Sequence, residues 1–238
     1  MRRWWVSLLM CGLVACSSGE TSAPTTTSAT TSTTSTTTTT IPSCEPAPLA
    51  DLQGCDFSRA NLIGANLAGA NLANANLASA NLSCLDQGFG TCADLTGAIL
   101  VGANLANANL GGANLAGANV GFAELAGADL TGANLNGADL TGANLTGARF
   151  GFDEIVGANL NGADLTEADA AYVVFKDTNL TNAILRGASI YKATFKNCNL
   201  TGADFTGAVT GNTYLIDSVL DGVIGLVDGV RGLEQPLP

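Results

Sequence analysis

The side chains that carry chemistry in this chain are carboxylates, amides and cysteines, because the sequence contains no histidine. It also lacks a glycine-rich phosphate loop and a credible pair of nucleophile and base. Catalysis by general acids and bases or by phosphate-binding loops depends on such groups at defined spacing. We therefore expect a protein that is not an enzyme and needs no cofactor.

Aspartates recur one residue before a leucine, and regular rows of carboxylates are typical of calcium sites. A calcium ladder needs acidic residues that stack from one coil to the next. The aspartates at this position never lie 20 residues apart, the coil length argued below: Asp129, Asp139, Asp164, Asp169 and Asp204. We predict instead that Asp and Asn at this position hydrogen-bond the local backbone of turns.

The cysteines show no C-x-x-C spacing, so the sequence does not predict a zinc site. Cys84 and Cys92 bracket the one clear interruption of a regular pattern, and Cys44 and Cys55 flank its first unit. In an exported chain we predict these two disulfides, the second of which fastens the N-terminal end. Cys198 takes the place of an alanine and is expected to be a small apolar core residue.

A group of aromatic and basic residues forms the candidate contact site for a partner. Phe152 and Tyr172 are predicted to stack at outward positions of one edge, with Tyr191 close by, and exposed aromatic clusters are typical of interfaces. Lys176 and Lys196 have the same spacing and should align on one face. The alternatives are rings that only cover an irregular coil and lysines on a solvated face.

A five-residue unit, Ala-Asn/Asp-Leu-x-x, positions these residues and runs from Ala50 to about Leu220. A step of five spreads the leucines around an α-helix and alternates them between the faces of a flat strand. One row is buried only if the chain turns after each unit, with Ala and Leu facing inward. Gly and Asn recur two residues after the leucine, where such a turn needs unusual dihedral angles. The pattern predicts a solenoid.

The unit resembles the A(D/N)LXX pattern of the pentapeptide-repeat family over most of the chain. The resemblance implies an all-β fold, a right-handed quadrilateral β-solenoid with four units per coil and about eight coils. With coils ~4.8 Å apart, the rod would be on the order of 40 Å long. Three pairs of residues lie 20 apart, as four units per coil require: Phe175 and Phe195, Lys176 and Lys196, Phe152 and Tyr172.

Two segments depart from the pattern. Residues 149–157 place Asp153 at an inward position, where a buried unpaired polar group costs roughly 2–7 kcal/mol, so we predict a local bulge. Residues 223–238 are apolar without the repeat and are expected to cap the open end of the solenoid. A homodimer contact through this tail is the alternative.

The first residues predict an export signal. Arg2 and Arg3 precede an apolar run, and residues 1–15 read as a signal peptide that is too short to span a bilayer. The run ends in Leu-Val-Ala-Cys16, which resembles a bacterial lipobox and implies cleavage before Cys16 and lipidation of its sulfur. Residues 16–43 are rich in Thr and Ser and are expected to be a disordered tether. The alternative is secretion with Cys16 unmodified.

The folded part is therefore predicted as a solenoid over residues 44–222, with a break at 83–92, followed by the cap. The net charge of −11 disfavours nucleic acid as a partner. We expect a lipid-anchored rod on the extracytoplasmic face of the cell membrane that binds or scaffolds an envelope protein.

Two further functions stay open at this point. Some members of the family resemble B-form DNA in width and charge and bind DNA gyrase, but an exported chain does not meet a cytosolic enzyme. A flat side with regular hydroxyls would suit a surface-templating binder of ice or glycans. Two threonine columns exist and both are interrupted, by Asn161 and Arg186 respectively: Thr141, Thr181 and Thr201, and Thr146, Thr166 and Thr206.

Overall fold

The computed structural model describes residues 44–85, 91–226 and 230–231. The predicted signal peptide, Cys16, the tether and most of the predicted cap lie outside the described residues. Within the described part, no helix has the length and apolar character needed to cross a membrane.

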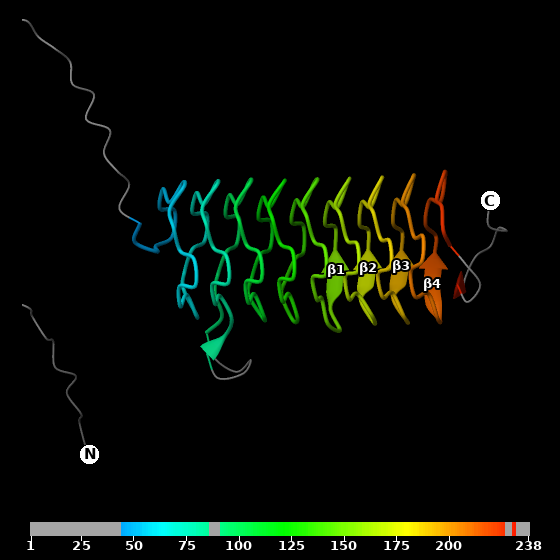
Figure 1. Cartoon of the computed structure of the whole chain (residues 1–238), viewed down its shortest axis with the longest axis horizontal. Coiled ribbons are helices and arrows are strands. Elements are labelled where there is room, and N and C mark those ends of the chain that lie inside the picture. Colours follow the sequence, from blue (N-terminus) through cyan, green and yellow to red (C-terminus); the bar gives the residue numbers. More distant parts are fainter. Residues whose placement is uncertain (1–43, 86–90, 227–229, 232–238) are drawn as a thin grey trace, which may run out of the picture. The chain divides into compact units, whose positions relative to one another are not determined.

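The described chain is a solenoid that returns to the same side after 20 residues (Figure 1). Isolated parallel bridges join Asn114 to Asn134 and Asn119 to Asp139, and the same relation repeats along the chain. Four five-residue units therefore make one coil. The predicted all-β solenoid is confirmed.

On one side the bridges extend into regular strands. The strands are β1 (Glu154–Val156), β2 (Val174–Lys176), β3 (Thr194–Lys196), β4 (Thr213–Ile216) and β5 (Val230–Arg231). They form one parallel sheet in the order β1-β2-β3-β4-β5. We call the outward-facing residues of the first four strands the β1–β4 side.

The core is a column of Leu or Phe from the unit centres and of Ala from two residues earlier. Leu130 and Ala128 are both completely buried, and the other regular units repeat this burial. Each regular unit closes with a turn, in which the Ala133 N–H donates to the Leu130 carbonyl at 2.9 Å. Gly132 in this turn has φ +72°, so the predicted turn position is confirmed.

Asp and Asn at the position before the leucine serve these turns, as predicted. The Asp129 carboxylate accepts the Thr131 N–H at 3.0 Å, and the Asn144 amide accepts the Thr146 N–H at 3.1 Å. Side chains in this position also join neighbouring coils, as where Asn134 donates to Asn114 at 3.0 Å. Among the described residues, no group of three or more His, Cys, Asp or Glu residues can hold a metal ion.

The break at 83–92 is an insertion within one coil. Asn76 bridges to Asn104, which is 28 residues later rather than 20, so eight residues are added while the register continues. A disulfide joins Cys84 to Cys92 at the base of the insertion, and a second disulfide joins Cys44 to Cys55 at the first coil.

The final coil departs from the usual polarity at several positions. Position 210 carries a buried threonine where most units carry leucine, and Thr213 is buried beside it. The outward positions that elsewhere hold Asn or Asp carry exposed apolar or aromatic residues: Val209, Tyr214, Val219 and Ile224. Leu226 and Val230 pack against the core, and β5 pairs with β4, so part of the tail covers the end of the sheet.

Candidate partner-binding face

Three aromatic side chains meet at one corner of the solenoid. The ring centroids of Phe152 and Tyr172 are 4.9 Å apart, and Tyr191 packs edge-on against Tyr172 at 5.7 Å. Phe152 is 79% exposed and Tyr172 is 40% exposed. The structure thus brings together the three aromatic residues that the sequence placed on one edge.

Lys192 completes this cluster and was not predicted as a member. Its Nζ lies 5.2 Å from the Tyr172 centroid and 5.1 Å from the Tyr191 centroid, within cation–π range. The interaction with Tyr191, followed by that with Tyr172, raises the pKa of Lys192. The signal was present in the sequence, because Lys192 follows Tyr172 by 20 residues. We call Phe152, Tyr172, Tyr191 and Lys192 the aromatic corner.

The backbone of this corner is costly for large side chains. Gly112 and Gly132 occupy the corresponding turn position in earlier coils, with φ +72° each. Tyr172 and Lys192 keep the same left-handed conformation, with φ +65° and +57°. Residues with a Cβ cost about 1–2 kcal/mol there. Other turns also hold residues with a Cβ in this conformation, among them Arg59, Phe122 and Glu167, so the conformation does not by itself mark this corner.

Lys176 and Lys196 lie on the adjoining β1–β4 side, one on β2 and one on β3. They are direct register partners, as predicted, and neither forms an ion pair within the described residues. Like charges opposite each other in a sheet repel. Folding alone therefore gives no reason for this alignment.

The composition of the face is unlike that of the rest of the chain. The chain has three tyrosines and three lysines, and all six lie at the aromatic corner or on the β1–β4 side: Tyr172, Tyr191, Tyr214, Lys176, Lys192 and Lys196. The chain runs directly from Tyr172 through β2 to Lys176, so the corner and the strands border one another.

The bulge predicted at residues 149–157 is wrong. Glu154 pairs with Val174 at the normal 20-residue spacing, so no residue is inserted. Instead, side chains bridge this junction between coils: Asp153 Oδ2 accepts the Gly132 N–H at 2.9 Å, and Asn136 Oδ1 accepts the Val156 N–H at 2.8 Å. Asp153 is half-buried, and this burial raises its pKa, although the Gly132 hydrogen bond opposes the shift.

Cys198 is buried, as predicted, but it does more than replace an alanine. Its thiol lies 3.3 Å from the Phe175 carbonyl oxygen and 3.5 Å from that of Lys196, which identifies it as a donor. Burial raises the pKa of Cys198 to about 11, so it remains a thiol. One coil earlier, the buried Thr178 hydroxyl donates to the Ile155 carbonyl at 3.2 Å.

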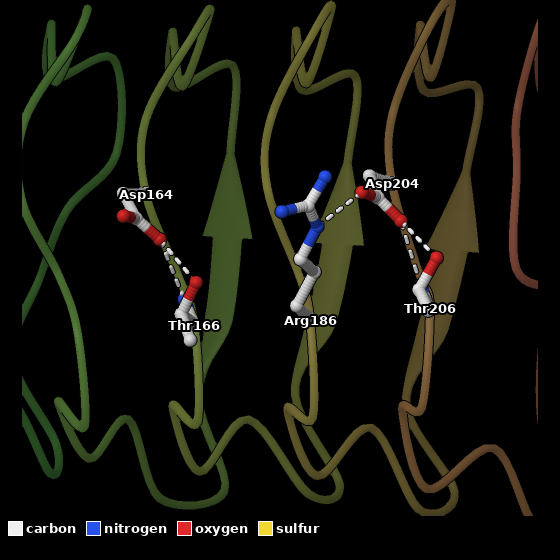
Figure 2. Close-up of polar contacts among 5 residues, drawn as sticks. All are labelled: Asp164, Thr166, Arg186, Asp204 and Thr206. Carbon is white, nitrogen blue, oxygen red and sulfur yellow. Dashed lines mark hydrogen bonds and ion pairs between the residues drawn. The ribbon is translucent and has the colours of Figure 1, made fainter.

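The threonine columns do not present free hydroxyls. Thr166 donates to Asp164 at 2.6 Å, and Thr206 donates to Asp204 (Figure 2). Arg186 interrupts this column and forms an ion pair with Asp204 (Figure 2). The Thr206 hydroxyl is the main cause that lowers the pKa of Asp204, and Arg186 adds to it. Hydroxyls that donate within the protein make a poor template for a crystal or polymer surface.

A shallow groove continues the line of the aromatic corner. It has a volume of about 650 Å³ and lies beside the Cys84–Cys92 disulfide; its lining residues are Ser83, Cys84, Cys92, Gly111, Gly112, Thr131 and Gly132. A Cβ on Gly112 would overlap the Cys84 sulfur, so glycine is required beneath the disulfide. Gly112 and Gly132 precede Phe152 at the same turn position, so groove and aromatic corner follow one another along one corner.

A family model described as pentapeptide repeats matches the chain in eight copies, over residues 50–85, 91–121, 123–152, 158–197 and 198–224. These segments cover more than half of the chain. Two of the gaps coincide with the inserted loop and with the junction at Asp153. No curated protein matches the sequence significantly.

Several solved structures are similar to this chain. QnrB1, a plasmid-mediated fluoroquinolone resistance protein, is 21% identical over 76% of this chain and 88% of its own, with a TM-score of 0.46. HetL from the cyanobacterium Nostoc sp. strain PCC 7120, involved in heterocyst differentiation regulation, is 29% identical over 76% and 91%, with a TM-score of 0.26. A protein from the Arabidopsis thaliana thylakoid lumen is 33% identical over 50% and 66%, with a TM-score of 0.32.

Proposed function

The chain belongs to the pentapeptide-repeat family, and on this premise we propose that it is a non-catalytic, extracytoplasmic lipoprotein whose solenoid binds or scaffolds an envelope partner. A lipid on Cys16 would hold it at the cell membrane. The contact surface is the aromatic corner with the β1–β4 side.

The observation that carries this proposal is the segregation of every tyrosine and lysine onto one face. Regular units need only Ala, Asn or Asp, and Leu to stack, as the coils before residue 149 demonstrate. The face departs from this simple pattern with exposed rings and with two lysines, Lys176 and Lys196, that form no ion pair within the described residues. Tyrosine is enriched in protein interfaces, and exposed aromatic residues in a cluster indicate contact sites.

The proposed location at the cell membrane rests on the sequence alone. A charged head, an apolar run, the Leu-Val-Ala-Cys16 sequence and a following Thr/Ser-rich tract agree with one another. A single acyl chain binds membranes only marginally, whereas the several chains of a lipoprotein anchor stably. Fully extended, the tether of residues 17–43 would reach at most about 90 Å.

Metabolic labelling with an alkyne fatty acid, followed by membrane fractionation, tests the anchor. We expect the wild-type protein to be labelled and membrane-bound, and Cys16→Ser to be unlabelled and released from the membrane. Cys198→Ser is the matched control and should behave as wild type. A cytosolic, unlabelled wild-type protein would contradict the proposal.

A photo-crosslinking amino acid at position 172 tests the face. We expect it to capture one specific envelope component in cells. The matched control is position 122, because Phe122 is also exposed, also has a positive φ, and lies on a different corner. If both positions capture the same abundant proteins, the face is not a specific binding surface.

A gyrase-binding role is the second candidate, because the net charge of −11 has the sign that a DNA mimic requires. The export signal opposes it. We expect the purified protein neither to inhibit nor to relieve gyrase supercoiling, and an effect at stoichiometric concentration would favour this role over the envelope role.

Self-association through the C-terminal end is a further proposal. The exposed Val209, Val219 and Ile224 of the final coil favour it, because outward positions elsewhere are mostly polar. Sedimentation equilibrium of the wild type and of Val209→Asn/Val219→Asn tests it. A monomeric wild type at micromolar concentration would refute it.

A further inference from the structure

We propose that the partner of the β1–β4 side is an acidic glycan, a linear carbohydrate bearing carboxylate groups that lies along the aromatic corner. This inference rests on the proposed function, which states that this face binds a partner, and it names the chemistry of that partner.

The dimensions of the face suit a linear chain better than a globular protein. Four coils at a spacing of ~4.8 Å span roughly 19 Å, and three extended residues span roughly 10 Å across the side. This flat part of the face, without the aromatic corner and the groove, has an area on the order of 200 Å². A stable protein interface buries about 800 Å² on each partner. One polymer strand fits the available surface.

An extended peptide cannot use its backbone here. Peptides that add to a sheet need an open edge with free N–H and carbonyl groups. On this side each strand pairs with the next coil, as where the Thr194 N–H donates to Val173 and the Tyr214 N–H donates to Ala193. The sheet therefore has no open edge between β1 and β4.

The aromatic corner offers what a sugar ring requires. Exposed rings bind the apolar face of a pyranose, and phenol groups add hydrogen bonds at the rim. Phe152 is 79% exposed and offers its ring to a sugar, and Tyr172, which packs against Phe152 and Tyr191, borders this position. Further units would extend from Phe152 into the groove floored by Gly112 and Gly132.

The charges call for an anionic ligand. Lys176 and Lys196 have no ion pair within the described residues, and Lys192 stays protonated above the tyrosine rings. These lysines stand out on a chain of net charge −11. Glu154 on β1, Asp177 after β2 and Asp217 after β4 repel anions, which confines the carboxylates of the ligand to the neighbourhood of the lysines. Binding through such exposed lysines weakens as salt is added.

The test uses the full-length lipoprotein purified in detergent, with calorimetric binding of polygalacturonate, chitohexaose and poly-L-glutamate. We expect polygalacturonate to bind at least about ten-fold more tightly than the neutral chitohexaose or the acidic peptide. Phe152→Ala/Tyr172→Asn should weaken binding by about ten-fold or more, and asparagine tolerates the positive φ at position 172. Lys176→Gln/Lys196→Gln should weaken it similarly and reduce its salt dependence.

Phe122→Ala and Arg59→Gln are the matched controls, because they remove an exposed ring and an exposed charge elsewhere on the solenoid. Both should bind polygalacturonate as wild type does. If poly-L-glutamate binds as tightly as polygalacturonate, and Phe152→Ala does not weaken its binding, the proposal of a glycan is overturned in favour of an acidic protein. Absence of polygalacturonate binding would overturn it as well, whereas a protein crosslinked specifically at position 172 would leave the proposed binding function intact.

Discussion

The thiol of Cys198 lies 3.3 Å from the carbonyl oxygen of Phe175, one coil earlier. Thr178 stands in the same relation to Ile155 and Ser218 to Phe195, each 23 residues apart. In a regular unit, a backbone N–H reaches this carbonyl, as from Ala183 to Leu180. On the β1–β4 side the turn opens into a strand, and the side chain of Thr178, Cys198 or Ser218 donates to the carbonyl instead.

Replacing this donor should weaken the strands beneath the lysines. We expect Cys198→Ala to lower the free energy of unfolding by about 1 kcal/mol, the typical net value of one hydrogen bond, and Cys198→Ser to retain it. Urea denaturation measures both. Thr178→Ala and Thr178→Ser form a matched pair with the same expected order. Equal stability of the Ala and Ser variants at both positions would show that the donors are dispensable.

Asp153 should make stability depend on pH. Its folded pKa is raised above the unfolded value of about 3.9, so protonation adds stability that is complete below about pH 4 and is lost as the pH rises through the folded pKa. Asp153→Asn keeps an acceptor for Gly132 without the charge. It should raise the stability at pH 7 by roughly 0.5 kcal/mol, allowing for solvent exposure, and leave that at pH 4 nearly unchanged.

Thermal unfolding of both proteins from pH 3.5 to 7.5 checks this expectation. Asp129 changes the stability little over most of this pH range. Burial acts to raise the pKa of Asp129, but its bonds to Thr131 and the charge of Arg149 outweigh this, and the pKa is lowered. The stability from Asp129 is lost only below about pH 4. A wild type and an Asp153→Asn variant with parallel curves would contradict the assignment.

The inserted loop should be removable. Deleting residues 84–91 joins Ser83 to Cys92-Ala-Asp-Leu, which restores the five-residue register without a gap. With Cys92→Gly at the turn position, we expect a folded solenoid with unchanged far-ultraviolet circular dichroism. Deleting residues 84–90 instead is the control, because it shifts the register by one residue and should disrupt the adjoining coil. A soluble, cooperatively folding control would show that register matters less than the bridges suggest.

Arg186 and Asp204 should couple weakly. The Asp204 side chain is only 8% exposed, and it accepts hydrogen bonds from the backbone N–H and the hydroxyl of Thr206. The Arg186 side chain is 61% exposed. We expect a double-mutant cycle of Arg186→Gln and Asp204→Asn to give a coupling of about 0.5 kcal/mol that falls at high salt. Because the pKa of Asp204 is lowered, its stabilising effect persists above about pH 4 and is lost as the pH falls further. A coupling that does not change with salt would contradict solvent screening.

The fold followed from the sequence because stacking constrains every unit in the same way. The pairs Phe175 with Phe195 and Lys176 with Lys196 lie 20 residues apart, and both pairs are register partners in the structure. The buried column of Leu and Ala followed from their two-residue separation. Because the unit repeats, a pattern of five residues was enough to predict the whole solenoid.

The site could be predicted only in part, because it lies where the repeat changes its local geometry. The aromatic stack was predicted from spacing, and Lys192 was missed although it has the same 20-residue spacing from Tyr172. The role of Cys198 depends on a carbonyl that changes its donor when the turn becomes a strand. Asp153 sits at a nominally inward position but reaches the Gly132 N–H, which no five-residue pattern specifies.

The direction of the hydrogen bonds has a mechanical consequence. Bonds between coils run along the solenoid axis, so tension between the two ends would load only the outermost coil at any moment. Such a rod should lengthen stepwise, and each released coil of 20 residues would add at most about 70 Å. The Cys44–Cys55 disulfide locks the first segment against this peeling. A solenoid of this kind under tension would lengthen and fail coil by coil.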